Sequence, residues 1–581
     1  MRKLAPPAAA LAAVLCISAV AQDRDQDHDR DWDKSQIKHV LLISIDGMHA
    51  IDFRNCADGI SGVNGGKSYC PNLSSLATTG VNYVAASTSK PSDSFPGLMT
   101  IVSGATPRTM GVYYDVAYDR SLDGPQVQTG NGNGPGPCTA GAAPTGFTTE
   151  YEEGIDLDQT KLNGGAPGAS LTDGGVASLD PTKMNRDPAA GCAPVYPWQF
   201  VRVNTIYGVI HKAGGYTAWS DKHPAYASVA GRDGVGVLDD FYSPEINSNV
   251  IGLPGVTTAS GLSCSSVPDG AADLTAWTNS FKNIQCYDTL KVNAILNEIA
   301  GKTHNGAHAK TPTIFGMNFQ SVSVGQKLVE NGTRGGYLDG VGTPTDSLLS
   351  EIEYVDDSVG QMIMKLKDRG LYESTLIIVT SKHGQSPIDP GALDKIPGKT
   401  NNGFSPATLI ANQLPSAMPD SENPNGSGIG STEDDVSLLW FTNPSYTESA
   451  LALLEANRAQ IGGGQIFYGP SLALNYNWPG LPPTGDPRTP DIFVQPNVGV
   501  IYTGSSKKVM EHGGFAHDDT NVMVLLSNPG FRPRTVFSEV GTLQVAPTIL
   551  KALGLNPSKL DGVRLEGTGA LPGVSLNVDQ Q

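Results

Sequence analysis

The sequence has few positive charges for its length. Its 581 residues carry 39 Lys and Arg against 57 Asp and Glu, so the formal net charge is −18. A protein this acidic repels phosphate backbones at long range, which argues against a nucleic acid polymer as partner. A small anionic substrate remains compatible with this charge, because cations inside a cleft act locally.

Long hydrophobic runs are also missing. The apolar stretch Leu11–Val20 is too short to span a bilayer, so we expect no stable membrane anchor. It follows a positively charged start and precedes small residues, which predicts a cleavable signal peptide over residues 1–21 and a secreted or periplasmic protein. Residues 22–36 alternate Asp with Arg and predict a charged, disordered linker.

Cysteines are few, and none forms a Cys-x-x-Cys pair or a Cys/His cluster that would indicate structural zinc. One of the seven falls in the predicted signal peptide, which leaves six. An even number in an oxidising compartment predicts disulfides. The sequence leaves several pairings open, and we favour pairing of neighbours along the chain: Cys56–Cys70, Cys138–Cys192 and Cys264–Cys286.

The chain has no internal repeats, and continuous apolar runs alternate with segments of helical periodicity. This rhythm predicts an α/β fold with a mostly parallel central sheet and helices on both faces, in one domain over residues 37–581. Stretches near 116–200, 225–285 and 386–435, rich in Gly, Pro, Asn and Ser, are interpreted as loop-rich insertions. The predicted strands are His39–Ile45, Thr313–Phe319, Thr375–Thr380 and Asn521–Leu526, and the predicted helices are Val203–Lys212, Tyr287–Ala300 and Leu348–Leu366.

Polar residues at the ends of these runs are candidates for chemistry, because ligands of open α/β sheets bind beyond the carboxyl ends of the strands. Asp46 follows the first strand, Lys382 and His383 follow a later one, and His512 precedes another.

Ser94 stands at the start of a helical pattern with Pro96 in its first turn. A helix N-terminus stabilises an alkoxide and binds anions, which makes Ser94 a candidate nucleophile. Serine is also a favoured N-cap residue, so a purely structural role is the alternative.

The order of these motifs resembles that of the alkaline phosphatase superfamily. Ser-Phe-Pro followed by Thr-Ile-Val-Ser-Gly is most similar to the branch of type I phosphodiesterases and nucleotide pyrophosphatases. The segment Thr542–Gly554 resembles the last helix of that superfamily. The resemblance implies an alkaline phosphatase-like fold and hydrolysis at phosphorus or sulfur through a covalent enzyme intermediate, with metal ions activating the nucleophile.

The resemblance also implies roles for single residues. Asp46 matches the first carboxylate ligand of the metal site, and Ser94 matches the nucleophile, which bridges to metal. His383 and His512 match imidazole ligands. Asp115 is a loose match to an Asn that contacts the phosphoryl oxygen.

Two departures alter the metal site. Lys382 stands where the branch has Asp, and Val322–Gln326 stands where it has Asp-x-x-x-His. Two adjacent dications would then lack compensating anions. We therefore expect Lys382 to replace one metal as a fixed cation and at most one divalent ion to remain. Zinc suits the carboxylate and imidazole ligands, whereas calcium would need further oxygens from Asp518 or Asp519.

Three further sites are weaker candidates. His517 is predicted to protonate the leaving group, with a solvated loop histidine as the alternative. His223 is a similar candidate in an inserted region. Asp356 and Asp357 could suggest a metal pair, but neighbouring residues of a helix point in different directions, so we expect solvated or packing carboxylates.

Together these features predict an exported, metal-assisted hydrolase of phosphodiester, phosphomonoester, pyrophosphate or related esters, acting on a small anionic substrate through Ser94. Two alternatives stay open: a sulfatase- or phosphonate hydrolase-like enzyme, and a degenerate family member that binds a ligand without turnover. The chain lacks the Cys-x-Pro-x-Arg signature of ordinary sulfatases. The exact substrate and the oligomeric state are not predicted.

Overall fold

The structure is a computed structural model that describes residues 37–129, 132–151, 175–247, 256–264, 278–398, 403–574 and 576. The predicted signal peptide and charged linker lie outside these residues, as do parts of the three predicted insertions. Each helix within the described ranges is too short or too polar to cross a lipid bilayer.

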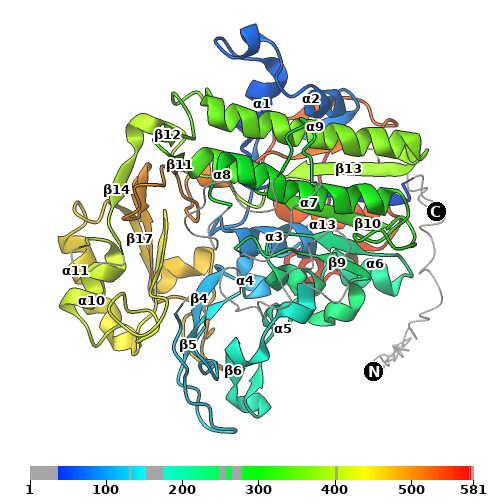
Figure 1. The fold of residues 1–581 in the computed structure, drawn as a ribbon. Coiled ribbons are helices and arrows are strands. Elements are labelled where there is room, and N and C mark those ends of the chain that lie inside the picture. The colour runs from blue at the N-terminus through cyan, green and yellow to red at the C-terminus, as the bar shows by residue number, and fades with distance from the viewer. Residues whose placement is uncertain are drawn as a thin grey trace, which may run out of the picture.

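A central sheet of eight strands organises the fold (Figure 1). Among these strands, β20 alone runs antiparallel to both neighbours, β13 and β2, while the other pairings are parallel. The predicted α/β class with a mostly parallel sheet is confirmed. In spatial order the strands are β21 (Arg534–Val536), β2 (Gly80–Tyr83), β20 (Leu525–Ser527), β13 (Thr375–Thr380), β1 (His39–Ile45), β10 (Ile314–Phe319), β8 (Ala218–Ser220) and β9 (Asp240–Tyr242).

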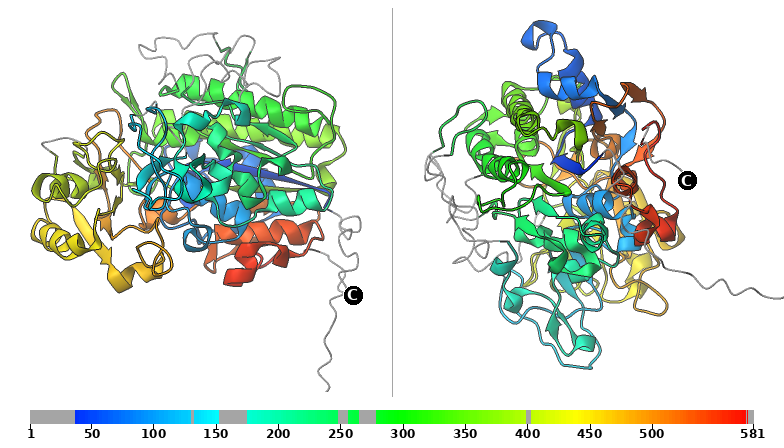
Figure 2. Two further views of the ribbon diagram at one scale, coloured as in Figure 1. Left: turned by 90° about the horizontal axis from the view of Figure 1, so that it is seen from below. Right: turned by 90° about the vertical axis from the view of Figure 1, so that its right-hand side faces the viewer.

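Helices cover both faces of this sheet, as the right-hand view of Figure 2 shows. Alternate residues of β1 therefore enter different cores: Val40 and Leu42 pack in one, Leu41 and Ile43 in the other. Burial on both faces explains why the strands read as unbroken apolar runs. One layer contains α3 (Ser94–Ser103), α6 (Ile206–Lys212) and α13 (Val545–Ala552), and the other contains α2 (Pro71–Ala77), α7 (Phe281–Ile299), α8 (Ser321–Lys327) and α9 (Asp346–Asp368).

The predicted elements agree with the observed ones to differing degrees. The bounds of β1 and β13 match their predictions. Helix α9 is capped by Thr345, whose side chain accepts a hydrogen bond from the Leu348 amide. The run Asn521–Leu526 contains only the beginning of β20, because its first residues form isolated bridges to other segments.

A second, smaller sheet stands beside the main one on the left of Figure 1, with α10 (Pro406–Gln413) and α11 (Thr447–Ala456) packed next to it. The sequence did not predict this unit, since β15 and β16 have only two and three residues and β17 begins with two glycines and a glutamine instead of an unbroken apolar run. The division into one domain with three insertions stays a prediction. The strands of the small sheet are β15 (Thr432–Glu433), β16 (Ser437–Leu439), β18 (Ile492–Pro496) and β17 (Gly463–Tyr468).

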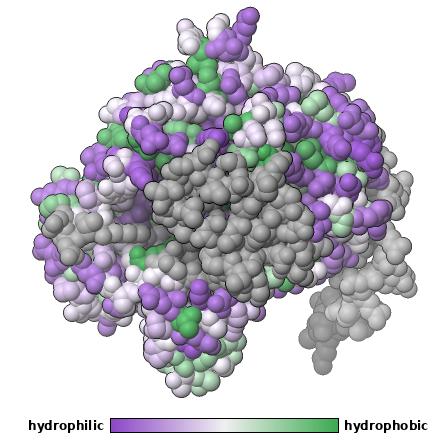
Figure 3. Space-filling model, in the orientation of Figure 1, coloured by the Kyte–Doolittle hydropathy of each residue, from purple (hydrophilic) through white to green (hydrophobic). Residues whose placement is uncertain are grey.

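All three predicted disulfides are confirmed. The first joins α1 (Ala50–Asp58) to the start of α2, and the third joins an inserted loop to α7. On the face shown in Figure 3, hydrophilic residues predominate and hydrophobic ones occur in small groups, in keeping with a protein of high net charge.

Asp356 has a structural role. Its carboxylate accepts hydrogen bonds from the backbone amides of Asn72 (3.1 Å) and Leu73 (2.7 Å), which lie in the first turn of α2. The neighbouring Asp357 is exposed. The two carboxylates therefore do not form a metal pair, as expected from their helical spacing.

We predict that Asp356→Ala destabilises the protein by about 1–2 kcal/mol, because the amides at the start of α2 lose their acceptor. Thermal unfolding followed by circular dichroism measures the change. Asp357→Ala, one residue away on the same helix, is the matched control and should leave the melting temperature within about a degree. Equal destabilisation by both variants would contradict the capping role.

Candidate functional site

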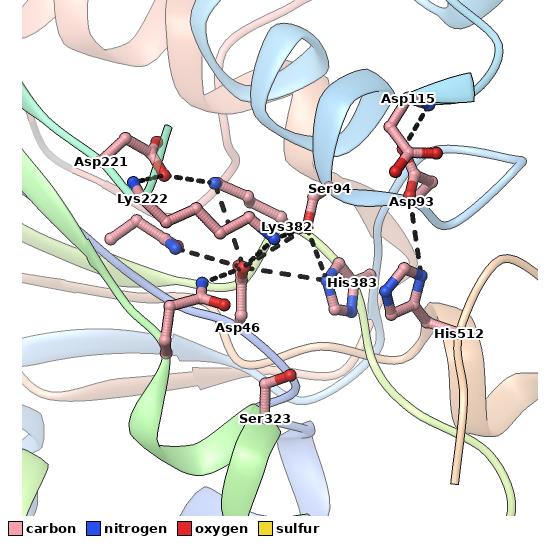
Figure 4. A network of polar contacts seen from close by, with 12 residues as sticks. Asp46, Asp93, Ser94, Asp115, Asp221, Lys222, Ser323, Lys382, His383 and His512 are labelled. Carbon is pink, nitrogen blue, oxygen red and sulfur yellow. Dashed lines mark hydrogen bonds and ion pairs between the residues drawn. The ribbon is translucent and has the colours of Figure 1, made fainter. Parts of the chain in front are cut away.

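The candidate site lies at the carboxyl ends of four neighbouring strands. Asp46 follows β1, and β1 pairs with β10 on one side and β13 on the other. Asn318 and Gln320 stand at the end of β10, and Lys382 follows β13. Lys222 follows β8, which pairs with β10. The register of the sheet therefore brings these polar side chains together (Figure 4).

Helix α3 adds the hydroxyl group. Asp93 is its N-cap residue, and the Asp93 carboxylate accepts a hydrogen bond from the Phe95 amide at 3.0 Å. The alternative interpretation of Ser94 as the N-cap is therefore wrong. Ser94 is the first residue of the helix, and its side chain points into the cluster (Figure 4).

Close packing fixes this helix against the end of β13. A Cβ atom on Gly97 would lie 2.2 Å from the Lys382 carbonyl oxygen, so a side chain at this position would collide with the backbone. Thr88 donates a short hydrogen bond to the same carbonyl. The backbone of residue 382 is thus held by α3 and by Thr88, which sets the distance between Ser94 and the strand end.

The Ser94 hydroxyl is buried and has three polar neighbours. Its oxygen lies 3.0 Å from Nε2 of His383, 3.2 Å from Nζ of Lys222 and 3.4 Å from Oδ2 of Asp46. Nδ1 of His383 lies 2.9 Å from the Gly384 carbonyl and must donate to it, since a carbonyl only accepts. Neutral His383 therefore keeps its lone pair on Nε2, within hydrogen-bond distance of Ser94, whose single hydroxyl proton can be donated either to His383 or to Oδ2 of Asp46.

Asp46 is the negative centre of the cluster. Its Oδ2 accepts hydrogen bonds from Gln320 (2.6 Å) and Asn318 (3.1 Å), and it lies 3.8 Å from Lys222 Nζ and 4.0 Å from Lys382 Nζ. Burial alone would raise the pKa of Asp46. The positive charges of Lys382 and Lys222, and that of His383 once it is protonated at low pH, lower the pKa of Asp46 well below its usual range. Asp46 is consequently an anion at neutral pH.

Lys382 is a buried cation with its own counter-ion. Its Nζ lies 2.9 Å from Oδ1 of Asp221 and 3.9 Å from the centre of the Tyr226 ring. A buried ammonium group needs such partners, because its desolvation otherwise costs several kcal/mol. Asp221 and Tyr226 therefore position Lys382 beside Asp46.

Two neutral imidazoles border the cluster on the side opposite Lys382. The His383 and His512 rings lie 4.0 Å apart between centres. Burial lowers the pKa of His383 to about 4, with Asp46 opposing and Lys222 reinforcing that effect. Burial and the proximity of His383 lower the pKa of His512 well below its usual value. Nδ1 of His512 lies 3.7 Å from the Asp93 carboxylate.

The structure thus brings Asp46, Ser94, Lys382 and His383 into direct proximity, with His512 beside them. Asp115 lies next to Asp93, to which its amide donates a hydrogen bond at 3.1 Å.

The remaining candidates lie apart from the described contacts of the cluster. The His517 side chain is exposed at the start of α12 (His517–Thr520). His223 pairs with Glu245 at 2.8 Å. The Asp518 carboxylate accepts a hydrogen bond from the Ile388 amide, and Asp519 is buried beside Asp435, where burial raises its pKa to about 7.

Sequence analysis did not identify Lys222, Asp221, Asn318 or Gln320. Asn318 and Gln320 stand at the end of a predicted strand, so their position alone made them candidates. Side-chain amides are also common in purely structural roles, so their residue type does not indicate catalysis. Lys222 follows a strand of only three residues. Its setting in Ser-Asp-Lys-His nonetheless resembles the Ser-Lys-His that follows β13.

Gln326, which ends the segment that stands in place of the family's Asp-x-x-x-His element, belongs to an amide network. Gln326 donates hydrogen bonds to the Gly47 carbonyl and to the Tyr337 hydroxyl, both at 2.8 Å, and accepts one from Gln385 at 2.6 Å. Across the described ranges, no group of three or more His, Cys, Asp and Glu side chains could hold a metal ion.

The charges around Asp46 do not fit a resident divalent ion either. Lys222 and Lys382 already balance the carboxylates of Asp46 and Asp221, so an added dication would leave an excess of two positive charges. At about 4 Å and an effective dielectric constant of about 20, each ammonium group repels a dication by about 8 kcal/mol and each carboxylate attracts it by about the same amount. The balanced set therefore gives no net attraction that would offset the desolvation of the ion. Among the described residues of the cluster, Oδ1 of Asp46 and Nδ1 of His512 are buried without a hydrogen-bond partner, yet one carboxylate oxygen and one neutral nitrogen do not offset that desolvation.

The chain was compared with known protein families, curated proteins and solved structures. The family model described as type I phosphodiesterase / nucleotide pyrophosphatase matches residues 40–155 and 339–517, about half of the chain. No curated protein matches the chain.

Similar solved structures include murine ectonucleotide pyrophosphatase / phosphodiesterase 5, with 12% identity, a TM-score of 0.48, and coverage of 89% of this chain and 96% of that one. The human protein of the same name has 12% identity, a TM-score of 0.47 and coverage of 89% and 95%. A mutant of the alkaline phosphatase PafA has 11% identity, a TM-score of 0.49 and coverage of 89% and 96%.

We predict that Gly97→Ala displaces α3 from the end of β13, because its methyl group would meet the Lys382 carbonyl. Overpacking of this kind costs about 1–3 kcal/mol, and a shift of Ser94 by about 1 Å lowers a rate by about 10²-fold. Thermal unfolding and steady-state hydrolysis of a chromogenic phosphodiester measure both effects. Gly236→Ala is the control, since a Cβ there meets nothing within 4 Å. Normal stability and activity of Gly97→Ala would refute the packing argument.

Proposed function

We propose, from the premise that this chain belongs to the type I phosphodiesterase / nucleotide pyrophosphatase family, that it hydrolyses small anionic phosphodiesters with Ser94 as the nucleophile. Membership confirms the resemblance drawn from the motifs and makes the chain a phosphoric ester hydrolase of the alkaline phosphatase superfamily. Phosphomonoesters, pyrophosphates and related phosphoryl esters form the wider class from which the substrate comes.

The observation that carries the proposal is the position of the Ser94 hydroxyl between an imidazole and an ammonium group. Nε2 of His383, 3.0 Å away, offers a lone pair for the hydroxyl proton. Nζ of Lys222, 3.2 Å away, donates a hydrogen bond that stabilises the alkoxide. The first turn of α3 adds the positive end of a helix dipole.

The proposed reaction has two steps. Oγ of Ser94 attacks phosphorus while its proton moves to His383, and the bond from phosphorus to the leaving oxygen breaks. The leaving oxygen keeps the electron pair and takes a proton from solvent. A water molecule then attacks phosphorus and gives one proton to solvent, the bond from Oγ to phosphorus breaks, and Ser94 regains its proton from His383. The products are an alcohol and a phosphate monoester.

The other groups predicted from the sequence are Lys382, a metal ion, His517 and Asp115, and of these only Lys382 has a role in the proposed mechanism. We propose that Lys382 holds a fixed positive charge beside Asp46. The single zinc or calcium ion expected from the sequence has no step in this mechanism, because the charges around Asp46 do not fit it. We assign no step to His517, which is exposed at the start of α12, or to Asp115, whose amide donates a hydrogen bond to Asp93.

Two alternatives are kept. Ser94 is buried, and within the cluster Lys222 and His512 are partly exposed, with 11% and 13% of their side chains accessible. Substrate must enter past these two side chains. Burial of the hydroxyl favours a member of the family that binds a phosphoryl ligand without turnover. A sulfatase- or phosphonate hydrolase-like reaction would use the same groups on another ester.

We predict that Ser94→Ala lowers hydrolysis of bis(p-nitrophenyl) phosphate by at least about 10³-fold, because the attacking oxygen is removed. Ser103→Ala, at the other end of the same helix, should retain activity within about threefold. Intact-mass spectrometry of acid-quenched enzyme should detect one phosphoryl ester adduct in wild type and none in Ser94→Ala. Undiminished activity of Ser94→Ala would remove the mechanism, and absence of turnover in wild type would favour the binding alternative.

We also propose that the protein is exported, which the three disulfides support, because such bonds persist in oxidising compartments. The predicted signal peptide should be removed before Gln22. N-terminal sequencing of the protein recovered from the periplasm or medium of an expressing bacterium should then begin at Gln22. Recovery of the chain only in the cytoplasm, with its initial residues intact, would refute export.

A further inference from the structure

Two lysines converge on the place where a member of this family carries metal ions. Lys222 and Lys382 come from different strand ends, and their Nζ atoms lie 3.8 Å and 4.0 Å from the same oxygen of Asp46. Lys222 also contacts the Ser94 oxygen at 3.2 Å. In Figure 4 the Lys222 side chain runs from beside Asp221 and ends next to Ser94 and Asp46, whereas the Lys382 side chain runs the opposite way and its ammonium group points toward Asp221.

We propose that Lys222 and Lys382 together replace the metal ions of the family, so that this site binds and cleaves its phosphoryl anion without a resident divalent metal. The inference rests on the proposed function, because it concerns the same site. Lys222 is the positioning and stabilising group for the transferring anion, and Lys382 neutralises Asp46.

The environment of each lysine supports this division of roles. Lys382 is fully buried and held by Asp221 and Tyr226, so it is a fixed charge that cannot reach a substrate. Lys222 keeps 11% of its side chain exposed and touches the nucleophile, so its ammonium group can contact an incoming phosphoryl oxygen. The residues present do not fit a metal ion equally well. Lys382 stands where the family has a carboxylate ligand, and Val322 and Gln326 stand where it has Asp and His.

The first experiment measures metal dependence. The full protein is purified without added metal, dialysed against EDTA and analysed by inductively coupled plasma mass spectrometry. We expect fewer than about 0.1 divalent ions per chain, hydrolysis of bis(p-nitrophenyl) phosphate within about twofold of the undialysed protein, and no gain on addition of zinc, manganese or calcium. A stoichiometric metal whose removal abolishes activity and whose return restores it would overturn the inference.

The second experiment does not require turnover. Inorganic phosphate is titrated calorimetrically into the metal-free protein. We expect binding that Lys222→Met weakens at least tenfold and that Lys222→Arg largely retains, since a positive charge persists. Lys212→Met, which removes an exposed lysine 62% accessible on α6, is the matched control and should bind like wild type. Thermal unfolding of each variant separates loss of binding from loss of folding.

The outcomes distinguish this inference from the proposed function. Failure of metal-free protein to bind phosphate, or phosphate binding that appears only with added metal, would overturn metal independence and leave Ser94 as the nucleophile. Full activity of Ser94→Ala would refute the proposed function, whereas metal-free phosphate binding that depends on Lys222 would still support the two-lysine site.

Discussion

The buried carboxylate of Asp46 constrains this protein more than any other group. A carboxylate with no solvent contact is stable as an anion only when nearby cations and donors compensate for lost hydration, a loss worth several kcal/mol. Here two ammonium groups and two side-chain amides supply that compensation. Their pull outweighs burial and lowers the pKa of Asp46. Every feature of the site that bears on chemistry is arranged around this one charge.

That compensation depends on the topology of the sheet. Asp46, Lys222, Lys382 and the two amides come from four strands that are neighbours in space but distant in sequence. Parallel pairing of β1 with β10 and β13 places their carboxyl ends on one edge. A shift of register by one residue would turn the side chains of a strand to the opposite face. The apolar cores on both faces, which fix the register, therefore also fix the charges.

The fold and part of the site could be predicted because long buried strands leave a strong pattern. β1 and β13 read as unbroken apolar runs, and the polar residues directly after them, Asp46 and His383, could be identified from sequence. Lys222 could not be identified from the sequence. The strand before it, β8, has only three residues, which is too short to show a hydrophobic pattern or to mark where the strand ends. The small second sheet was not predicted because β15 and β16 are as short as β8 or shorter, and β17 begins with glycines and a glutamine. The N-cap of α3 could not be assigned from the sequence either. Asp93 and Ser94 are both favoured N-cap residues, and only the hydrogen bond from the Phe95 amide to the Asp93 carboxylate identifies the cap.

The charges of the cluster also explain why Lys382 in place of the family's Asp and Val322–Gln326 in place of its Asp-x-x-x-His element occur together. With Lys382 replaced by the carboxylate typical of the family, Asp46, Asp221 and residue 382 would place three negative charges around Lys222 alone, a state that calls for a dication. With Lys382 present, a dication adds two positive charges to a balanced set. Each arrangement is stable only as a whole, because Coulomb energies at about 4 Å amount to several kcal/mol even at an effective dielectric constant of about 20. The proposed replacement of metal ions by ammonium groups therefore involves Lys382, its counter-ion Asp221 and the amide network at Gln326 together.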